Sequence, residues 1–513
     1  MWIGTVDHCR RIDSRAISEF GIPARVLMER AGLAVFEAVT ELLPKGGALG
    51  VVCGHGNNGG DGFVVARLAK EHGYLVGCLV AATLDQLSTE AREQMQLATS
   101  SGVDPVFVDD ERWERKLECL GKCDLIVDAL LGTGAKAEVR GHVKVAIEAV
   151  NRSGAPAVAV DVPSGIDASS GEELGESIWA LRTVTFGLPK PFLFEGIGVE
   201  HAGYWTVADI GLPHALLAEP TEAFLIENGW VADLLPERMK CSHKGENGSI
   251  LIVAGSRRMP GAATMAAKAA LRAGAGLVTV AAVQSVCDAV AHHLPEVLFM
   301  PLPETDGVIA AEAAEIILEA QHRHHSAVFG PGLSQGLSVL EFLSRVFDKL
   351  ALPAVIDADA LNAVSQGVLL PKGECVLTPH PGEMGRLLES SVAEIQADRF
   401  HAVTAAVAKF GRAVLLKGPY SIVGEPDQPM VVNQTGNPGM ASGGMGDVLS
   451  GVIATLLAEE LPGYYAGACG MYWHGYAGDL AAESLGCIGY TAMEVADRLP
   501  AARAKITELC DGC

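Results

Sequence analysis

The feature that most constrains the fold is a glycine-rich stretch near the C-terminus, residues 435–451, with the sequence TGNPGMASGGMGDVLSG. An apolar run follows from Val448, so we predict that a helix starts there. Small residues leave backbone N–H groups uncovered, and the first amides of a helix have no partner within it. The stretch therefore predicts a phosphate site, with Asp447 placed to accept a proton from an attacking hydroxyl. The alternative is a flexible loop in which Asp447 only caps the helix.

Length and composition limit the remaining possibilities. A chain of 513 residues predicts more than one domain. With 59 glycines and only 5% aromatic residues, the composition favours α/β packing with tight turns over a sandwich of aromatic strands. The net charge of −24 argues against nucleic acid and anionic membranes as partners, because such a field repels phosphates. A phosphate-bearing ligand must then be held by local amides and a few lysines.

Cysteine usage and hydropathy predict a cytoplasmic protein. The 12 cysteines form no clear framework and have no histidines at zinc-finger spacing, so reduced thiols are favoured over disulfides or a metal site. The N-terminal residues are polar and contain no apolar export segment. No apolar run reaches the roughly 18 residues needed to cross a bilayer, so we expect no membrane partner.

The first half of the chain is predicted to form parallel β-α units. Short apolar strands are expected at residues 49–53, 75–80, 125–129, 157–161 and 184–186, with a helix from 63 to about 72 and others between the later strands. Polar segments follow the first, third and fourth of these strands: GHGNNGGDG, DALLGTG and DVPSGID. Open α/β sheets bind ligands at such strand ends. The alternative is that each aspartate only caps a following helix. The glycines at 54, 56 and 59 match the dinucleotide fingerprint, but its distal acidic residue is missing.

These motifs, together with TVTFGLPKP at 183–191 and DIG at 209–211, resemble the NAD(P)H-hydrate epimerase domain. That domain is Rossmann-like and interconverts the two C6 epimers of hydrated NADH and NADPH. The resemblance covers about residues 1–215, and we assign residues 1–218 to a Rossmann-like three-layer αβα domain. It implies potassium ligands at Asn58, Asp128 and Ser164, which offer the oxygen atoms that hard cations prefer. The residues that it places against the substrate's phosphates, nicotinamide portion and reacting ring are Asn57, Asn58, Gly59, Gly60, Asp61, Gly132, Thr133, Gly134, Ala135, Lys136, Ala137, Glu138 and Asp161.

Two residues of this domain are candidates for proton transfer during epimerisation. Asp161 and Lys190 are suited to moving the C6 hydroxyl between faces of the ring. Two routes remain open: opening of the ring, or loss of water followed by its return.

The second half of the chain is also predicted to be α/β, with strands at 249–254, 277–282, 327–330, 354–356, 375–377 and 413–416. Long helices are expected at 262–273, 392–410 and 464–484. No GxxxxGK[ST] motif occurs, so a nucleotide site here needs another device, which the glycine-rich stretch supplies. Lys244 and Lys417 stand beside glycines in loops, and either one is otherwise a solvated surface group.

The ordered motifs of this half resemble the ADP-dependent NAD(P)H-hydrate dehydratase of the ribokinase-like superfamily over about residues 225–505. They are KGENG at 244–248, AGS at 254–256, PGAA at 260–263, GPG at 330–332, DADALN at 357–362, LTPHPGE at 377–383 and the glycine-rich stretch. We assign residues 224–510 to a ribokinase-like αβα domain. The implied contacts to the hydrated nucleotide are Ala262, Gly332, His380 and Asp447. The implied contacts to ADP are Lys417, Gly418, Pro419, Tyr420, Ser421, Asn437, Gly439, Gly443, Gly444 and Gly446.

The implied reaction is phosphorylation of the C6 hydroxyl of the S hydrate, followed by elimination of phosphate, with ADP giving AMP. Phosphate leaves far more readily than water does. Asp447 is expected to be the base, the amides at 443–446 to stabilise the transferred phosphoryl group, and magnesium to bridge nucleotide oxygens. His380 is expected to orient the substrate. Glu383 is either a supporting residue behind it or, as we slightly favour, a carboxylate at a helix N-terminus.

The sequence as a whole predicts a bifunctional repair enzyme with NADH hydrate, NADPH hydrate and ADP as its small-molecule substrates, and we expect a homo-oligomer. The alternative is a ribokinase-like small-molecule kinase with a non-catalytic, ligand-binding N-terminal domain.

Overall fold

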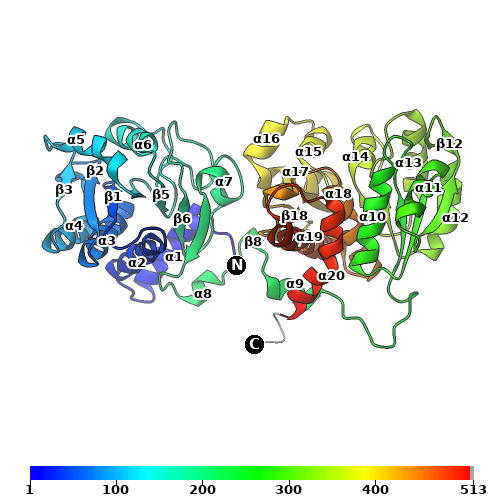
Figure 1. Ribbon diagram of the computed structural model, residues 1–513, viewed down its shortest axis with the longest axis horizontal. Coiled ribbons are helices and arrows are strands. Elements are labelled where there is room, and N and C mark those ends of the chain that lie inside the picture. The colour runs from blue at the N-terminus through cyan, green and yellow to red at the C-terminus, as the bar shows by residue number, and fades with distance from the viewer. Residues whose placement is uncertain (509–513) are drawn as a thin grey trace. The chain divides into compact units, whose positions relative to one another are not determined.

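The computed structural model describes residues 1–508 and divides into two compact units, Met1–Thr221 and a second that begins at Glu222 (Figure 1). The residue at which we expected the second domain to end, 510, lies outside the described part. No helix within residues 1–508 has the length and apolar character needed to cross a membrane.

The first unit contains a seven-stranded sheet of order β3-β2-β1-β4-β5-β6-β7. All its neighbouring strands pair in parallel, so their carboxyl ends meet at one edge. The order reverses between β1 and β4, where open sheets of this kind leave a crevice for ligands. The strands are β1 (Ala48–Cys53), β2 (Leu75–Val80), β3 (Pro105–Phe107), β4 (Leu125–Ala129), β5 (Ala157–Val160), β6 (Arg182–Phe186) and β7 (Tyr204–Ala208).

Apolar side chains fill both faces of this sheet. Val51 and Cys53 of β1 belong to a buried cluster that includes α2, α3 and α4, whereas Val52 belongs to a second cluster with α5 and α6. This division follows from the two-residue period of a strand, and it produces the predicted three-layer αβα fold. A third cluster joins α1 to α2 through Ile12 and Leu27. The helices are α1 (Val6–Ser18), α2 (Ala24–Leu42), α3 (Asn57–Glu71), α4 (Thr89–Ser100), α5 (Trp113–Glu118), α6 (Gly141–Ser153), α7 (Gly198–His201) and α8 (His214–Leu217).

The second unit contains a ten-stranded sheet of order β11-β10-β9-β14-β15-β16-β17-β18-β19-β8. Neighbouring strands from β11 to β17 are parallel, and β17, β18 and β19 are joined antiparallel. The order reverses between β9 and β14. The strands are β8 (Ala223–Leu225), β9 (Ser249–Val253), β10 (Leu277–Val283), β11 (Leu298–Leu302), β14 (Ser326–Phe329), β15 (Ala354–Ile356), β16 (Cys375–Leu377), β17 (Ala413–Leu416), β18 (Ile422–Gly424) and β19 (Met430–Val432), with β12 (Glu304–Thr305) and β13 (Val308–Ile309) forming a separate two-stranded sheet.

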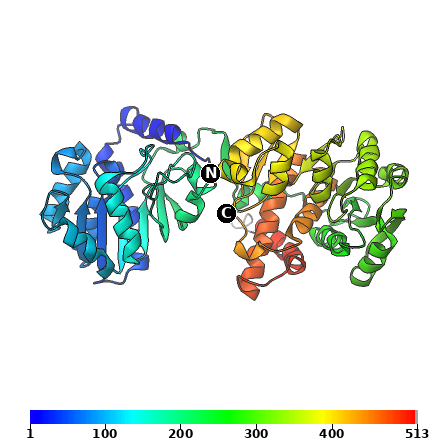
Figure 2. The same ribbon diagram turned by 90° about the horizontal axis from the view of Figure 1, so that it is seen from above.

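Helices cover this sheet in two groups. The helices α10, α18, α19 and α20 pack against one another, and α18 and α19 are buried along most of their length. In Figure 2 the orange and red helices of residues 445–508 lie on the opposite side of this unit from the yellow helices of residues 381–410. The fold is the predicted αβα class. The helices are α9 (Asn228–Leu234), α10 (Pro260–Ala273), α11 (Gln284–His293), α12 (Ala313–Ala320), α13 (Leu337–Lys349), α14 (Ala358–Ser365), α15 (Pro381–Leu388), α16 (Val392–Ala397), α17 (Arg399–Phe410), α18 (Met445–Ala458), α19 (Gly463–Leu485) and α20 (Ala492–Glu508).

Three predicted boundaries are wrong. The segment from Asn57, expected as a loop up to residue 62, forms the first turns of α3, so its amides lie at a helix N-terminus. The helix expected over 392–410 breaks at Asp398, whose carboxylate accepts the amide of His401 at 2.9 Å and caps α17. The helix expected to start at Val448 begins at Met445, so Asp447 lies within its first turn.

Candidate active sites

A pocket of about 540 Å³ opens at the carboxyl edge of the first sheet, where the strand order reverses. It is lined by the segments that follow β1, β4 and β5, together with residues of α1 and α2. The structure therefore brings together most of the residues predicted to bind the epimerase substrate. Those that line the pocket are Asn57, Asn58, Asp61, Gly132, Thr133, Gly134, Ala135 and Asp161.

The other predicted residues lie outside this lining. Gly59 and Gly60 are buried in the first turn of α3, where Gly59 packs against the carbonyl group of Gly54. Lys136, Ala137 and Glu138 follow the pocket-lining loop. The side chain of Glu138 is 59% exposed and pairs with Arg140 at 2.6 Å.

Asp161 and Lys190 form an ion pair beside this pocket. The Lys190 ammonium, 2% exposed, donates to Asp161 Oδ1 at 2.7 Å and to Thr185 Oγ1 at 2.8 Å. Burial favours the neutral amine, but the Asp161 carboxylate outweighs this and holds the pKa of Lys190 above its usual value. Asp161 has a left-handed backbone with φ of 65°, a strained conformation often found at functional sites. An adjoining cavity of about 80 Å³ is lined by both residues and by Asp13 of α1.

The three predicted potassium ligands meet around the backbone of Leu131. Asp128 is fully buried, and its carboxylate accepts the Ser164 hydroxyl at 2.6 Å and the Ser164 amide at 2.8 Å. The Leu131 amide donates to Ser164 Oγ at 2.8 Å, and Asn58 Nδ2 donates to the Leu131 carbonyl at 3.0 Å. This set offers neutral oxygens and a single carboxylate, which fits a monovalent hard cation. Among residues 1–508 there is no cluster of three or more His, Cys, Asp or Glu placed for a metal.

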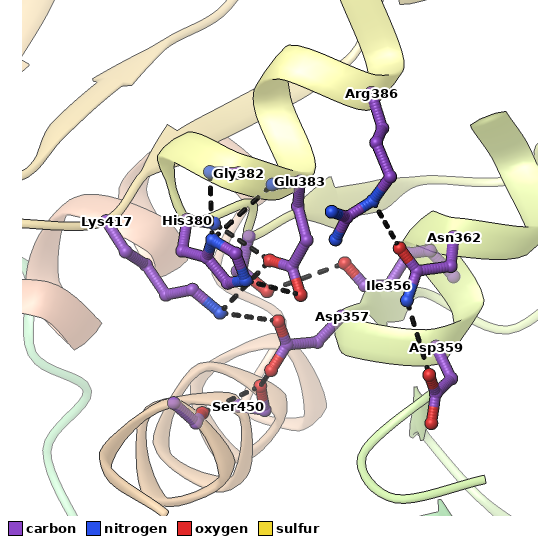
Figure 3. Close-up of polar contacts among 12 residues, drawn as sticks. Ile356, Asp357, Asp359, Asn362, His380, Gly382, Glu383, Arg386, Lys417 and Ser450 are labelled. Atoms are coloured by element: carbon purple, nitrogen blue, oxygen red, sulfur yellow. Dashed lines mark hydrogen bonds and ion pairs between the residues drawn. The ribbon is translucent and has the colours of Figure 1, made fainter. Parts of the chain in front are cut away.

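The second unit holds a buried network centred on Asp357, at the carboxyl end of β15 (Figure 3). Its carboxylate, 1% exposed, accepts Lys417 Nζ at 2.6 Å and Ser450 Oγ at 2.7 Å. Glu383 lies 3.8 Å from the same ammonium. Burial alone would lower the pKa of Lys417, but Asp357 and Glu383 hold it above its usual value. Lys417 is therefore a fixed positive charge beside Gly446, one of the residues predicted to contact ADP.

Asp447 lies in the first turn of α18, next to this network. The residue before the helix is Gly444, whose φ of 91° favours glycine, and no side chain caps the helix. The alternative in which Asp447 is the N-cap is therefore wrong. Burial raises the pKa of Asp447 to about 7, and the Asp357 carboxylate adds to this. No hydrogen-bond partner of the Asp447 carboxylate is present among residues 1–508, so this group is available as a base.

His380 and Glu383 form a capping box at the start of α15. His380 Nδ1 accepts the Gly382 amide at 3.0 Å, and Glu383 Oε2 accepts the His380 amide at 2.8 Å. Burial lowers the pKa of His380, so its ring is neutral. Glu383 is thus the helix N-terminal carboxylate that we favoured, and it also contributes negative charge near Lys417.

The other predicted dehydratase residues lie in loops and at the starts of helices. Ala262 and Gly332 face each other at the reversal between β9 and β14, since a Cβ on Gly332 would lie 2.8 Å from that of Ala262. Gly446 lies against Lys417, because a Cβ there would come within 3.2 Å of Nζ. No atom lies within 4 Å of the place where a Cβ on Gly443 would be, so its backbone is accessible to a ligand. Lys244, by contrast, is exposed in its loop.

The 417–421 and 437–439 loops are both held by polar contacts. The buried Arg399 side chain donates to the Tyr420 carbonyl at 3.4 Å and lies against Gly418, with Pro419 and Ser421 in the same loop. Asn437 Oδ1 accepts the Gly439 amide at 3.1 Å and the Tyr490 hydroxyl at 2.6 Å.

Sequence reasoning gave no role to Asp357, Ser450, Arg399 or Asp13. Only Asp357 has a local signal, because it directly follows an apolar strand. Ser450 sits within an apolar helix and Arg399 starts an amphipathic one, so their partners become visible only in the folded chain.

Comparisons with known proteins match both units. A family described as NAD(P)H-hydrate dehydratase matches residues 250–501, and one described as YjeF-related protein N-terminus matches residues 24–192. The chain is 39% identical to the bifunctional NAD(P)H-hydrate repair enzyme Nnr of Moorella thermoacetica, over 98% of this chain and 96% of that protein. It is 36% identical to the enzyme of the same name from Thermofilum pendens, over 99% and 97%. A ribokinase-like superfamily protein from Enterococcus faecalis, 24% identical, matches with a TM-score of 0.50 over 56% of this chain and 98% of that one, which shows the fold.

Proposed function

The chain belongs to the family of bifunctional NAD(P)H-hydrate repair enzymes, and we propose that its first unit interconverts the C6 epimers of the hydrate while its second unit dehydrates the S epimer at the expense of ADP. The observation that carries this proposal is the combination of two unlike carboxylate sites in one chain. Asp161 is paired with a buried ammonium in an open pocket. Asp447 stands unpaired, among residues 1–508, at a helix N-terminus that suits a phosphoryl group.

In the second unit, Asp447 takes the proton of the C6 hydroxyl as its oxygen attacks the terminal phosphorus of ADP. The amides at the start of α18 and the Lys417 ammonium stabilise the charge that develops on the transferred group. The N1 lone pair then forms an iminium at C6 as the C6–O bond breaks and phosphate leaves. Loss of a proton from C5 places the C5–H electrons in the C5–C6 double bond, returns the iminium electrons to N1 and restores the dihydropyridine. AMP and phosphate are the products derived from ADP.

Magnesium would reach this site bound to the nucleotide. Lys417 already neutralises Asp357, and the described residues contain no cluster of three or more potential metal-ligating side chains. A magnesium ion bound with the nucleotide would supply positive charge at the transferred phosphoryl group. Asp447 and Glu383, whose carboxyl groups both act on Lys417, would help to hold this ion in their ionised forms.

In the first unit, the oxygen set of Asn58, Asp128 and Ser164 would hold potassium next to the segment from 131 to 134. The ion would fix this loop against the substrate's phosphates. We expect potassium to accelerate epimerisation and lithium not to replace it, because the smaller ion needs a tighter set of ligands.

The potassium assignment is tested by following epimerisation against potassium concentration for the wild-type chain and for Asp128→Asn. The substitution is expected to raise the potassium requirement about 10–100-fold, as with other weakened metal sites. The ADP-dependent step serves as the internal control and should not change. An unchanged potassium requirement in Asp128→Asn would refute the assignment.

The pH dependence of dehydration should follow Asp447. Because the base acts only when ionised and its pKa is raised to about 7, kcat/KM is expected to rise with pH and level off above 7. Below the midpoint the rate should fall about tenfold per pH unit. The measurement is NADH formation from pure S hydrate between pH 5.5 and 8.5. A flat profile across this range would exclude Asp447 as the titrating base.

The proposed function is tested with a mixture of hydrate epimers and the purified full chain, in the presence of magnesium and potassium, with and without ADP. Complete ADP-dependent recovery of NADH, with matching amounts of AMP and phosphate, is the expected result. Recovery that stops after the S epimer would show that the first unit does not epimerise. A stable phosphorylated product without NADH would indicate a small-molecule kinase.

A further inference from the structure

The helix α1 forms one wall of the epimerase pocket, although it lies outside the matched family region, which begins at residue 24. Arg10 and Asp13, one turn apart, both line the pocket together with Thr133 and Asp161. Asp13 also lines the adjoining cavity that contains Lys190. A carboxyl group from a separate element therefore shares the cavity with the Asp161–Lys190 pair.

We propose that Asp13 is a catalytic acid–base residue of epimerisation, which exchanges a proton with the substrate in concert with the Asp161–Lys190 pair. This inference rests on the proposed epimerase function and assigns the second proton-transfer group at the same site.

The position of Asp13 is set by packing and not by its own carboxyl group. Ile12 and Ala16 of α1 are buried in a cluster with Leu27 and Ile210. Thr5 caps the helix, its hydroxyl accepting the His8 amide at 3.2 Å. No hydrogen-bond partner of the Asp13 carboxyl is present among residues 1–508, so its polar atoms face the cavity. A group with no structural task and a fixed place in a substrate pocket is suited to chemistry.

The electrostatics give the two carboxyl groups different properties. Asp13 is open to solvent in the pocket but enclosed by protein on its other sides, and this burial raises its pKa to about 6. The Lys190 ammonium opposes the rise and the Asp161 carboxylate adds to it. The direct ion pair of Lys190 is with Asp161 and not with Asp13. Carboxyl groups in such unlike environments divide naturally into an acid and a base.

Other titratable or charged groups around Asp13 are Cys9 and Arg10 on α1, and Asp61 and His55 across the pocket. Burial raises the pKa of the Cys9 thiol and raises that of Asp61 well above the usual range, which favours the neutral form of both groups. Arg10 donates to the Thr133 carbonyl at 3.3 Å. In this wall of the pocket, Asp13 is thus the group whose protonation changes close to pH 6, because burial raises its pKa.

Both routes of epimerisation need two such groups. In ring opening, one carboxylate takes the C6 hydroxyl proton, the O–H electrons form the aldehyde C=O, and the C6–N1 pair passes to N1, which takes a proton from the second group. Rotation and the reverse steps give the other epimer.

In the second route, an acid protonates the C6 oxygen, water leaves, and the N1 lone pair forms an iminium. Water then adds from the opposite face, the iminium electrons return to N1, and a carboxylate takes the released proton. Protons and electrons balance in each cycle.

The test is the rate of R-epimer consumption by the full chain with ADP, magnesium and potassium, under conditions in which dehydration is fast. Asp13→Asn keeps the shape of the side chain and is expected to slow this phase about 100-fold or more, while S-epimer dehydration stays unchanged. The acid limb near pH 6 should disappear from the epimerisation profile. Asp13→Glu should restore part of the rate, and Glu37→Gln, an exposed carboxylate on α2, should match wild type.

The outcomes separate this inference from the function on which it rests. If the wild-type chain epimerises and Asp13→Asn has the same rate and pH profile, the role of Asp13 is overturned, while the epimerase function stands. If the acid limb of the epimerisation profile is lost in His55→Gln but retained in Asp13→Asn, the histidine and not Asp13 is the acid–base residue. A wild-type chain that leaves the R epimer untouched overturns the epimerase function itself. Asp13→Glu provides the same readout if the asparagine variant fails to fold.

Discussion

Asp447→Asn is expected to abolish ADP-dependent dehydration, lowering kcat by about 10²–10⁴-fold, while epimerisation continues. The asparagine keeps the volume of the side chain but cannot accept the proton of the attacking hydroxyl. The carboxylate is available because its helix is capped by Gly444 and not by Asp447 itself. Removing a negative charge from a site crowded by Asp357 and Glu383 should also leave ADP binding intact or tighter.

The measurement is single-turnover formation of NADH from pure S hydrate, with ADP affinity determined separately. Asp427→Asn is a matched control, because Asp427 lies in an exposed turn with a φ of 61° that asparagine also tolerates. If Asp447→Asn keeps more than a tenth of the wild-type rate, another group is the base. Asp357 is poorly suited to replace it, since Lys417 and Ser450 already occupy its oxygens.

Asp161→Asn is expected to stop repair of the R epimer and leave repair of the S epimer unchanged, so that recovery of NADH from a mixture halts part-way. The rate of epimerisation should fall at least about 100-fold, because the substitution removes a proton acceptor held 2.7 Å from Lys190. It also leaves a buried ammonium without its counter-charge, which costs about 3–5 kcal/mol when one partner of a buried pair is removed.

The two effects are separated with Lys190→Met and the double variant Asp161→Asn/Lys190→Met. Each single variant should lower the thermal unfolding midpoint of the first unit, and the double variant should recover part of that loss because no charge remains buried. Epimerisation should stay absent in all three. Asp109→Asn, in an exposed turn, is the control. Full epimerisation in the double variant would show that the pair is only structural.

The sequence by itself determined the fold class, the central parallel strands of both sheets and the strand ends that carry the sites, but not the outer strands β3, β7, β11, β18, β19 and β8. These depend on local patterns, namely short apolar runs, glycines and polar residues directly after a strand, and each is legible without knowing the partners. Helix starts were less well predicted, since α3 begins at Asn57 and absorbs a segment that reads as a glycine loop.

Only the tertiary structure decided which side chains meet. Lys417 reaches Asp357 across 60 residues of sequence, and Ser450 reaches the same carboxylate across 93. Asp13 joins Asp161 in one cavity because the apolar face of α1 packs beside the sheet edge. Such meetings depend on the order of strands in each sheet and on the packing of helices over it. Neither leaves a periodic signal at the residues concerned, so the carboxylates that share a site are recognisable only once the chain has folded.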